Sequence, residues 1–180
     1  MIIGSLNIRG GGNVLKRRRI KSLILKGNVD VFMIQETKIT NFQDFVAKRF
    51  WKNVGIGYSF TNSLGFTGGL LTLWKEKEME VLNSFKGEGY LGIKFRKENK
   101  LYYLVNIYSS CDLNKKRTLW RKLLDLKELF NDGEWIIGGY FNAIKDYNER
   151  NGRAEVTNYN EMNFFADFIE KSMLVDIHLV

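Results

Sequence analysis

Short apolar runs, each about as long as a β-strand, alternate along this chain with amphipathic stretches of helical period. The clearest run is Val-Phe-Met-Ile at 31–34, which carries no polar residue and therefore predicts a strand that is buried on both faces. Leu15–Leu25 shows the helical pattern, with Ile20, Leu23 and Ile24 on one face, and Gly27 ends it. A chain with both patterns must bury its sheets against helices, which limits the fold to mixed α/β layers.

Further runs and periodic stretches extend this interpretation to the whole chain. Strands are expected at Met1–Leu6, Val29–Gln35, Gly55–Phe60, Gly69–Trp74, Met79–Phe85, Tyr90–Phe95, Leu101–Tyr108, Glu134–Gly138 and Val175–Leu179. Helices are expected at about Lys115–Phe130, at Glu161–Met173, and in a short segment marked by Phe42, Phe45, Val46 and Phe50. The elements do not follow strict β-α-β alternation, so several strands can pair as meanders. The sequence therefore predicts one α/β domain, 1–180, with two facing sheets and helices outside them.

Composition narrows the class of partner. Lysine and arginine number 28 against 20 aspartates and glutamates, which gives a net charge of +8. Such a charge fits nucleic acid, although many basic proteins bind nothing in particular. The run Arg17–Arg19 fits either a localisation signal or the solvated face of a helix. The one cysteine, Cys111, excludes a disulfide framework and a cysteine-based zinc site, and no apolar run reaches the length of a membrane span. We expect an intracellular protein with no membrane partner and no obligate protein partner.

Two polar motifs follow the first two long apolar runs. Asn7 lies in Ser-Leu-Asn-Ile-Arg-Gly at 5–10, where it either orients a ligand at the end of a strand or simply forms a turn with the glycine. Glu36 lies in Gln-Glu-Thr-Lys at 35–38, directly after the strand at 31–34. A carboxylate there can hold Mg²⁺, which proteins usually bind with one or two carboxylates plus water and substrate phosphate. The alternative is that the chain leaves the core there with polar residues.

Two more motifs end later strands. Tyr108 closes Asn-Ile-Tyr at 106–108, and Lys115–Arg117 form a basic triplet shortly after it. A tyrosine hydroxyl and a cation both suit a phosphate backbone, although a half-buried strand tyrosine and a solvated charge run explain them equally. Asn142 lies in Gly-Tyr-Phe-Asn at 139–142, and Asn-Glu-Arg follows at 148–150.

In this order the motifs resemble the endonuclease/exonuclease/phosphatase family, which includes deoxyribonuclease I, abasic-site endonucleases and the endonuclease domains of non-LTR retrotransposons. The family pattern runs Trp-Asn, Gln-Glu-Thr/Lys, Asn-Val-Tyr-x-Pro, Gly-Asp-Phe-Asn and Ser-Asp-His. The segments at 69–74, 106–120 and 148–150 look most like the plant retrotransposon version. The resemblance covers essentially the whole chain and implies the four-layer α/β/β/α sandwich of deoxyribonuclease I.

The resemblance also implies roles for particular residues. Glu36 would be the metal-binding carboxylate of a Mg²⁺ (or Mn²⁺) site, and Asn7 its amide partner. Tyr108 would contact the scissile phosphate, and Asn142 would position the nucleophile or the phosphate. The implied partner is DNA, held through its phosphate backbone, and the implied location is the nucleus.

Several departures from the family pattern bear on activity. Tyr140 stands where the family has the aspartate that orients or deprotonates the attacking water, and a phenol titrates near pH 10. Leu6 replaces the tryptophan, and Ser110 replaces the proline. We expect a C-terminally truncated domain that lacks the last strands and the closing Asp-His pair, because the family pattern continues beyond the segment Val175–Ile177. His178 falls where retrotransposon relatives often have proline, so we do not expect it to be the missing histidine.

Three functions are consistent with these residues. The first is a degenerate, retrotransposon-derived endonuclease domain without useful catalysis. The second is a basic module that binds nucleic acid without cutting it. The third is a nuclease or phosphatase that works with fewer groups. A salt titration separates the second from the first, since phosphate contacts release counterions.

Overall fold

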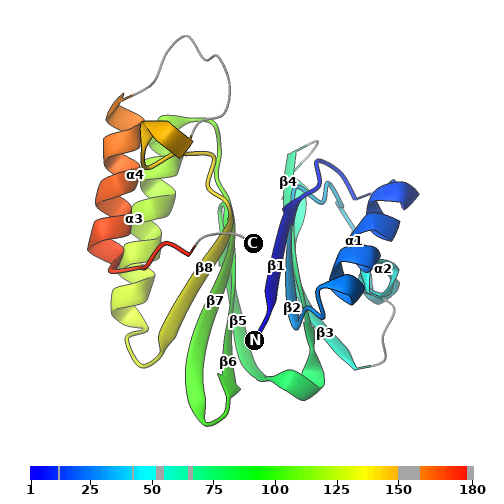
Figure 1. Ribbon diagram of the computed structural model, residues 1–180. Coiled ribbons are helices and arrows are strands. Elements are labelled where there is room, and N and C mark those ends of the chain that lie inside the picture. The colour runs from blue at the N-terminus through cyan, green and yellow to red at the C-terminus, as the bar shows by residue number, and fades with distance from the viewer. Residues whose placement is uncertain (12, 42, 52–54, 65–66, 150–158, 178–180) are drawn as a thin grey trace. The chain divides into compact units, whose positions relative to one another are not determined.

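The computed structural model describes residues 1–180 except 12, 42, 52–54, 65–66, 150–158 and 178–180 (Figure 1). The chain divides into two compact units. The first joins Met1–Tyr108 to Gly133–Tyr140 and holds all of the strands assigned in the described residues. The second joins Ser109–Asp132 to Phe141–Val180 and holds two long helices.

The first unit is built on two four-stranded sheets. The first sheet has the order β1 (Ile3–Asn7), β2 (Val31–Gln35), β4 (Thr67–Lys75) and β3 (Ile56–Leu64). The second has the order β5 (Glu80–Gly87), β6 (Tyr90–Lys97), β7 (Lys100–Tyr108) and β8 (Glu134–Tyr140). The pairs β1–β2 and β7–β8 are parallel, and the other neighbours are antiparallel. Figure 1 shows the two sheets face to face.

Helices α1 (Val14–Lys26) and α2 (Asp44–Phe50) cover the outer face of the first sheet (Figure 1). The side chain of Asn13 caps α1 by accepting a hydrogen bond from the backbone N–H of Leu15. Ile20 and Ile24 of α1 are buried, as their spacing predicts, and Phe50 of α2 joins the same apolar cluster. The apolar face of each helix therefore sets which side of it meets the sheet.

Strand β2 explains why the run at 31–34 is wholly apolar. Phe32 and Ile34 pack in the cluster beneath α1 and α2, whereas Val31 and Met33 pack in the cluster between the two sheets. Alternate side chains of a strand point to opposite faces, so a strand covered on both faces needs apolar residues at every position. The prediction of a strand buried on both sides is confirmed.

The second unit is organised around α3 (Leu113–Leu129) and α4 (Tyr159–Ser172), with a short 3-10 helix η2 (Tyr147–Glu149) between them in the chain. Asp112 caps α3 by accepting from the backbone N–H of Lys115. Trp120 of α3 packs against Phe165 and Phe168 of α4, with ring centroids 5.4 and 6.2 Å away. The aromatic contact fixes how these two helices pair.

The predicted mixed α/β class with two sheets is confirmed, but the strand predicted at Val175–Leu179 is wrong over the residues that the structure describes. Residues 174–177 form no strand, and Val175 and Ile177 are 85% and 79% exposed. Alternating apolar residues form a strand only where a sheet edge satisfies their backbone groups, and here no such pairing occurs. The short helix predicted from Phe42, Phe45, Val46 and Phe50 is confirmed as α2, on which Phe45 is exposed and lies under the guanidinium of Arg49. The predicted residues Phe42 and His178 lie outside the described residues. No helix within the described ranges is long and apolar enough to cross a membrane.

A glycine pair beside the loop after β2 gives a test of this packing. Gly68 and Gly69 have nearly the same backbone φ, +80° and +82°, but a Cβ on Gly69 would lie 2.4 Å from Oγ1 of buried Thr37, whereas a Cβ on Gly68 meets nothing within 4 Å. Both alanine variants should lose about 1–2 kcal/mol through left-handed strain. Gly69→Ala should lose a further 1–3 kcal/mol, roughly, through overpacking. Urea unfolding of the two variants measures the difference, and equal losses would contradict the close contact.

Candidate active site

Asn7 and Glu36 meet at the end of the first sheet. Parallel pairing of β1 and β2 sets Asn7 opposite Gln35, so Glu36 is the first residue beyond the paired segment. The Nδ2 group of Asn7 donates to Oε1 of Glu36 at 3.0 Å, and Oδ1 of Asn7 accepts from the N–H of Arg9 at 3.1 Å. Asn7 is therefore held at both ends of its amide and orients the Glu36 carboxylate.

The two loops that carry this pair adopt unusual backbone conformations. Glu36 has φ of 53°, and Arg9 and Lys38, each two residues beyond a member of the pair, have φ of 46° and 54°. Non-glycine residues rarely adopt this left-handed region, and such strain tends to be kept where function needs it. Both loops are fixed by hydrogen bonds from the N–H of Gly10 to the carbonyl of Glu36 and from the N–H of Gly11 to the carbonyl of Thr37, at 2.7 and 2.6 Å.

Basic side chains of α1 hold the first of these loops. Lys16 donates to the carbonyls of Ile8 and Arg9, and Arg17 donates to the carbonyl of Gly11 at 2.8 Å. Arg18 and Arg19 are exposed, so the prediction of a solvated helix face holds for them and is wrong for the partly buried Arg17. The reason is the tight loop before α1, whose free carbonyls need donors.

Tyr108 and Tyr140 form a stacked pair at the end of the second sheet. They are register partners in the parallel β7–β8 pair, and their ring centroids lie 6.0 Å apart with an interplanar angle of 22°. The backbone beneath them is tight: Gly139 has φ of +131°, and a Cβ there would lie 2.2 Å from the carbonyl oxygen of Ile107. The Tyr140 ring therefore lies against Tyr108 at the end of β8.

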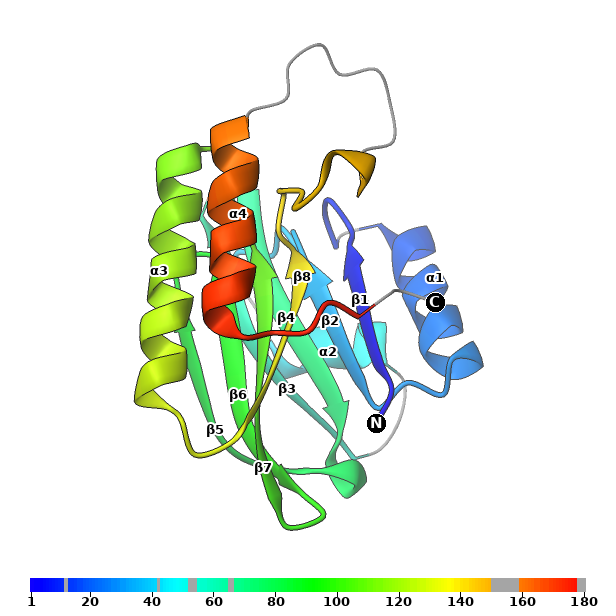
Figure 2. The same cartoon turned by 60° about the vertical axis from the view of Figure 1, so that its left-hand side comes forward.

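Strands β1, β2, β7 and β8 all end at the same end of the first unit. Figure 2 shows the arrowheads of β1 and β8 side by side there. A hydrogen bond of 2.7 Å from Gln35 to Asn106 joins β2 to β7 near that end. The structure thus brings Asn7 into direct contact with Glu36 and puts Tyr108 at the same end of the unit. Their chemical roles stay predictions.

Asn142 belongs to the second unit and is described within it. Its backbone is left-handed, with φ of 52°, and its Nδ2 group donates to the Sγ atom of Cys111 at 3.1 Å. Its carbonyl accepts from the Nζ group of Lys116, which also forms an ion pair with Glu161. Lys116, which belongs to α3, therefore contacts both α4 and the segment that follows β8.

The predicted role of the basic triplet at 115–117 is wrong for Lys116. Its side chain is only 3% exposed, because it lies on the same face of α3 as Leu119, Trp120 and Leu123, one helical turn apart. Arg117 lies with its guanidinium 3.6 Å from the centre of the Phe164 ring. The helical spacing of the apolar residues, read around position 116, was the signal that could have identified Lys116 as internal.

The residues at this end offer a metal ion one carboxylate. Within the described ranges there is no group of three or more histidine, cysteine, aspartate or glutamate side chains able to hold a metal. Glu36 still has a second carboxylate oxygen, and Mg²⁺ is commonly held by a single carboxylate with water and substrate phosphate. Among the described residues, this donor set fits a hard cation that is held by one carboxylate together with water and phosphate oxygens.

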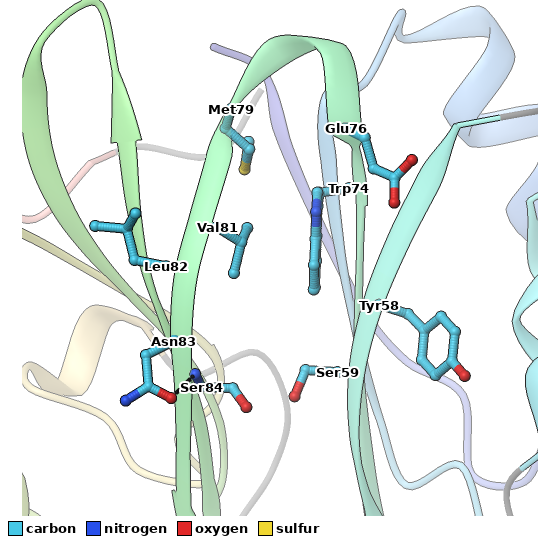
Figure 3. Close-up of a pocket in the computed structure, with 9 residues that line it drawn as sticks. All are labelled: Tyr58, Ser59, Trp74, Glu76, Met79, Val81, Leu82, Asn83 and Ser84. Atoms are coloured by element: carbon cyan, nitrogen blue, oxygen red, sulfur yellow. Dashed lines mark hydrogen bonds between the residues drawn. The ribbon is translucent and has the colours of Figure 1, made fainter.

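A pocket of about 560 Å³ lies elsewhere in the first unit, between β3, β4 and the start of β5 (Figure 3). Trp74 lies on its inner wall and pairs with Val31 at the start of β2, whereas Leu70 pairs with Gln35 at its end. The pocket therefore lies at the opposite end of β2 from Glu36, and none of the predicted site residues line it. Figure 3 shows Val81 and Ser84 facing Trp74 and Ser59 across it.

Comparisons with known proteins agree with the fold described above. The sequence profile of the Endonuclease/Exonuclease/phosphatase family matches residues 4–169. No curated protein matches the chain. The solved structures that share its fold include the AP endonuclease LMAP from Leishmania major, the catalytic domain of Xenopus laevis APE2, and the 3′ phosphatase NExo from Neisseria bound to a product DNA hairpin.

The structural similarity is extensive although the sequences have diverged. The TM-scores for the three, in that order, are 0.74, 0.72 and 0.68, with sequence identities of 14%, 17% and 12%. The matches cover 94%, 93% and 94% of this chain. They cover 66%, 67% and 70% of the three neighbours, so the chain spans about two thirds of their length. Because the family profile matches residues 4–169 of this chain, the chain belongs to the endonuclease/exonuclease/phosphatase family.

Proposed function

We propose that this chain is a catalytically silent form of a metal-dependent DNA endonuclease domain, derived from a non-LTR retrotransposon, that keeps a weak divalent-metal site. The observation that carries the proposal is the Tyr140 ring stacked on Tyr108 at the end of the second sheet. That position is the one at which the family pattern has the aspartate that acts on the attacking water. A neutral phenol has no carboxylate oxygen to accept a proton from water, so Tyr140 cannot replace an aspartate as a base.

The size of the ring adds to the effect of its chemistry. Tyr140 is far bulkier than aspartate, and its contact with Tyr108 engages the side chain expected to reach the scissile phosphate. In-line attack needs a water molecule and a phosphate close together, with reacting atoms about 3–3.5 Å apart. We infer that the stacked rings displace one of these two reactants.

Glu36 and Asn7 are the residues that would hold a divalent metal. Mg²⁺ bound at Glu36 would supply positive charge to the phosphoryl oxygens of DNA. Asn7 would fix the carboxylate in place through its 3.0 Å hydrogen bond. Because one carboxylate is a small ligand set, binding should be weak in the absence of a nucleic-acid phosphate.

The second candidate function is a basic module that binds DNA without cutting it. Arg9 and Lys38 are exposed, and each follows a member of the Asn7–Glu36 pair by two residues. The net charge of +8 favours a polyanion, and the Neisseria neighbour was solved with a DNA hairpin. This function is compatible with silent catalysis, since phosphate contacts position DNA without taking part in hydrolysis.

The retrotransposon origin rests on sequence motifs and not on the fold. The segments at 69–74, 106–120 and 148–150 resemble the plant retrotransposon version of the domain. In such an element the ancestral reaction nicks target DNA so that a 3′ end can prime reverse transcription. We accordingly propose a nuclear location for the protein.

The first prediction concerns cleavage. The purified chain should nick supercoiled plasmid in Mg²⁺ or Mn²⁺ no faster than its Glu36→Ala variant, because loss of a general base commonly costs about 10²–10⁴ in rate. Tyr140→Asp alone should stay equally inactive, because the family pattern also requires a closing Asp-His pair. Nicking by the unmodified chain that disappears in Glu36→Ala would refute the silent state.

The second prediction concerns the metal. Mn²⁺ should bind with an affinity that paramagnetic relaxation of water protons can detect, and Glu36→Ala should abolish that binding. Asn7→Ala should weaken it by about 10-fold, since removing a residue that orients a ligand commonly costs 10–100-fold. Retained Mn²⁺ binding in Glu36→Ala would assign the ion to another site.

The third prediction concerns DNA. Arg9→Asn and Lys38→Asn, which keep a residue tolerant of left-handed φ, should each reduce the salt dependence of duplex binding by about one phosphate contact. Lys100→Asn is the matched control, because Lys100 is equally exposed but lies at the far end of β7 from Tyr108. A fluorescence anisotropy titration at several salt concentrations measures the slopes. The same slope in all three variants would show that DNA does not contact this end.

A further inference from the structure

Two residues of the shared motifs have no role in the function proposed above. Gln35 precedes Glu36 at the end of β2, and Asn106 lies two residues before Tyr108 in β7. Gln35 is 1% exposed and Asn106 is fully buried, so both amides lie in the core between the two sheets. Buried amides are costly unless their polar atoms are paired, so each needs a structural reason.

The two amides hydrogen-bond to each other across the gap between the sheets. Nε2 of Gln35 donates to Oδ1 of Asn106 at 2.7 Å. Nδ2 of Asn106 in turn lies 3.2 Å from the carbonyl oxygen of Leu71 and 3.3 Å from Oγ1 of Thr72, both in β4. A β7 side chain is thus tied to two neighbouring strands of the other sheet.

Gln35 also reaches the strand that carries Asn7. Its Nε2 group donates to Oγ of Ser5 in β1 at 3.1 Å. One amide therefore connects β1, β2 and β7 at three positions, Ser5, Gln35 and Asn106. Each of these positions precedes a predicted site residue by one or two places: Asn7, Glu36 and Tyr108 respectively.

We propose that Gln35 and Asn106 are a positioning pair that holds the Glu36 carboxylate against Asn7. The proposal rests on the metal-binding part of the proposed function for its chemical purpose, but not for its geometry. Apolar side chains alone would let the sheets shift by small amounts, because dispersion contacts have no strict direction. A buried hydrogen bond is directional and sets one arrangement.

The hydrogen bond from Asn7 to Glu36 provides the readout. The NMR signals of the Asn7 side-chain amide in Glu36→Ala define the state without an acceptor. Gln35→Met and Asn106→Leu remove the amides while keeping similar shapes, and both should move the Asn7 signals most of the way toward that state. Mn²⁺ affinity should fall by about 10–100-fold in both variants. Because Asn106 is in the other sheet, its effect on Asn7 must pass between the sheets.

Two controls separate positioning from loss of stability. Leu104→Ala removes a fully buried side chain from the same face of β7, two residues before Asn106, and should destabilise the fold without moving the Asn7 signals. The double variant Gln35→Asn with Asn106→Gln keeps the combined length of the two amide side chains. It should return the Asn7 signals to their positions in the unmodified chain. If either single variant fails to fold, Thr72→Val, which removes one acceptor of Asn106, should give a smaller shift in the same direction.

The outcomes distinguish this proposal from the proposed function. Unchanged Asn7 signals in folded Gln35→Met and Asn106→Leu would overturn the positioning pair. An equal shift in Leu104→Ala would do the same, since it would show a general loosening. Absence of Mn²⁺ binding in the unmodified chain would overturn the metal site, while the Asn7 signals would still decide the positioning pair.

Discussion

The hydrogen bond between Gln35 and Asn106 is the contact on which the geometry of this end of the molecule depends. Both amides are buried in the layer between the sheets, where Val31, Met33 and Leu104 supply apolar packing. That packing stabilises the sandwich through area removed from water, but it does not by itself select one register between sheets. The amide pair does, because an unpaired buried amide costs about 1–3 kcal/mol.

Under the proposed function, the chain would keep the framework of a metal site and differ from the family pattern in one side chain. The Asn7–Glu36 pair, the left-handed loops and the amide pair are intact, and each requires specific side chains or backbone angles. The change is concentrated at Tyr140, where an aromatic ring stacks on Tyr108. A substitution that fills space and forms a favourable aromatic contact is compatible with a stable fold. The silent state that we propose therefore does not require a less stable fold.

Strain and burial distinguish this end of the molecule from the pocket between β3, β4 and β5. Glu36, Arg9 and Lys38 all have positive φ, and backbone hydrogen bonds together with the side chains of Lys16 and Arg17 hold their loops. The pocket is lined mainly by strand residues and lies at the opposite end of β2. None of the residues with roles in the proposed function lines it.

Much of the fold was determined by the sequence itself. The wholly apolar run at 31–34 could only be a strand covered on both faces, and the spacing of Ile20 and Ile24 fixed the inner face of α1. The order of the motifs around Asn7, Glu36 and Tyr108 was likewise enough to predict the family and the candidate residues.

Only the tertiary structure decided the long-range contacts. Gln35 and Asn106 are 71 residues apart, and no local pattern pairs two polar residues across such a distance. The sequence around Lys116 fits a solvated charge run, but the packing of α3 buries this side chain. Val175 and Ile177 alternate with polar residues as in a strand, but they pair with no sheet edge and are exposed. Local spacing sets which face a side chain takes, whereas its partner depends on which distant segment folds against that face.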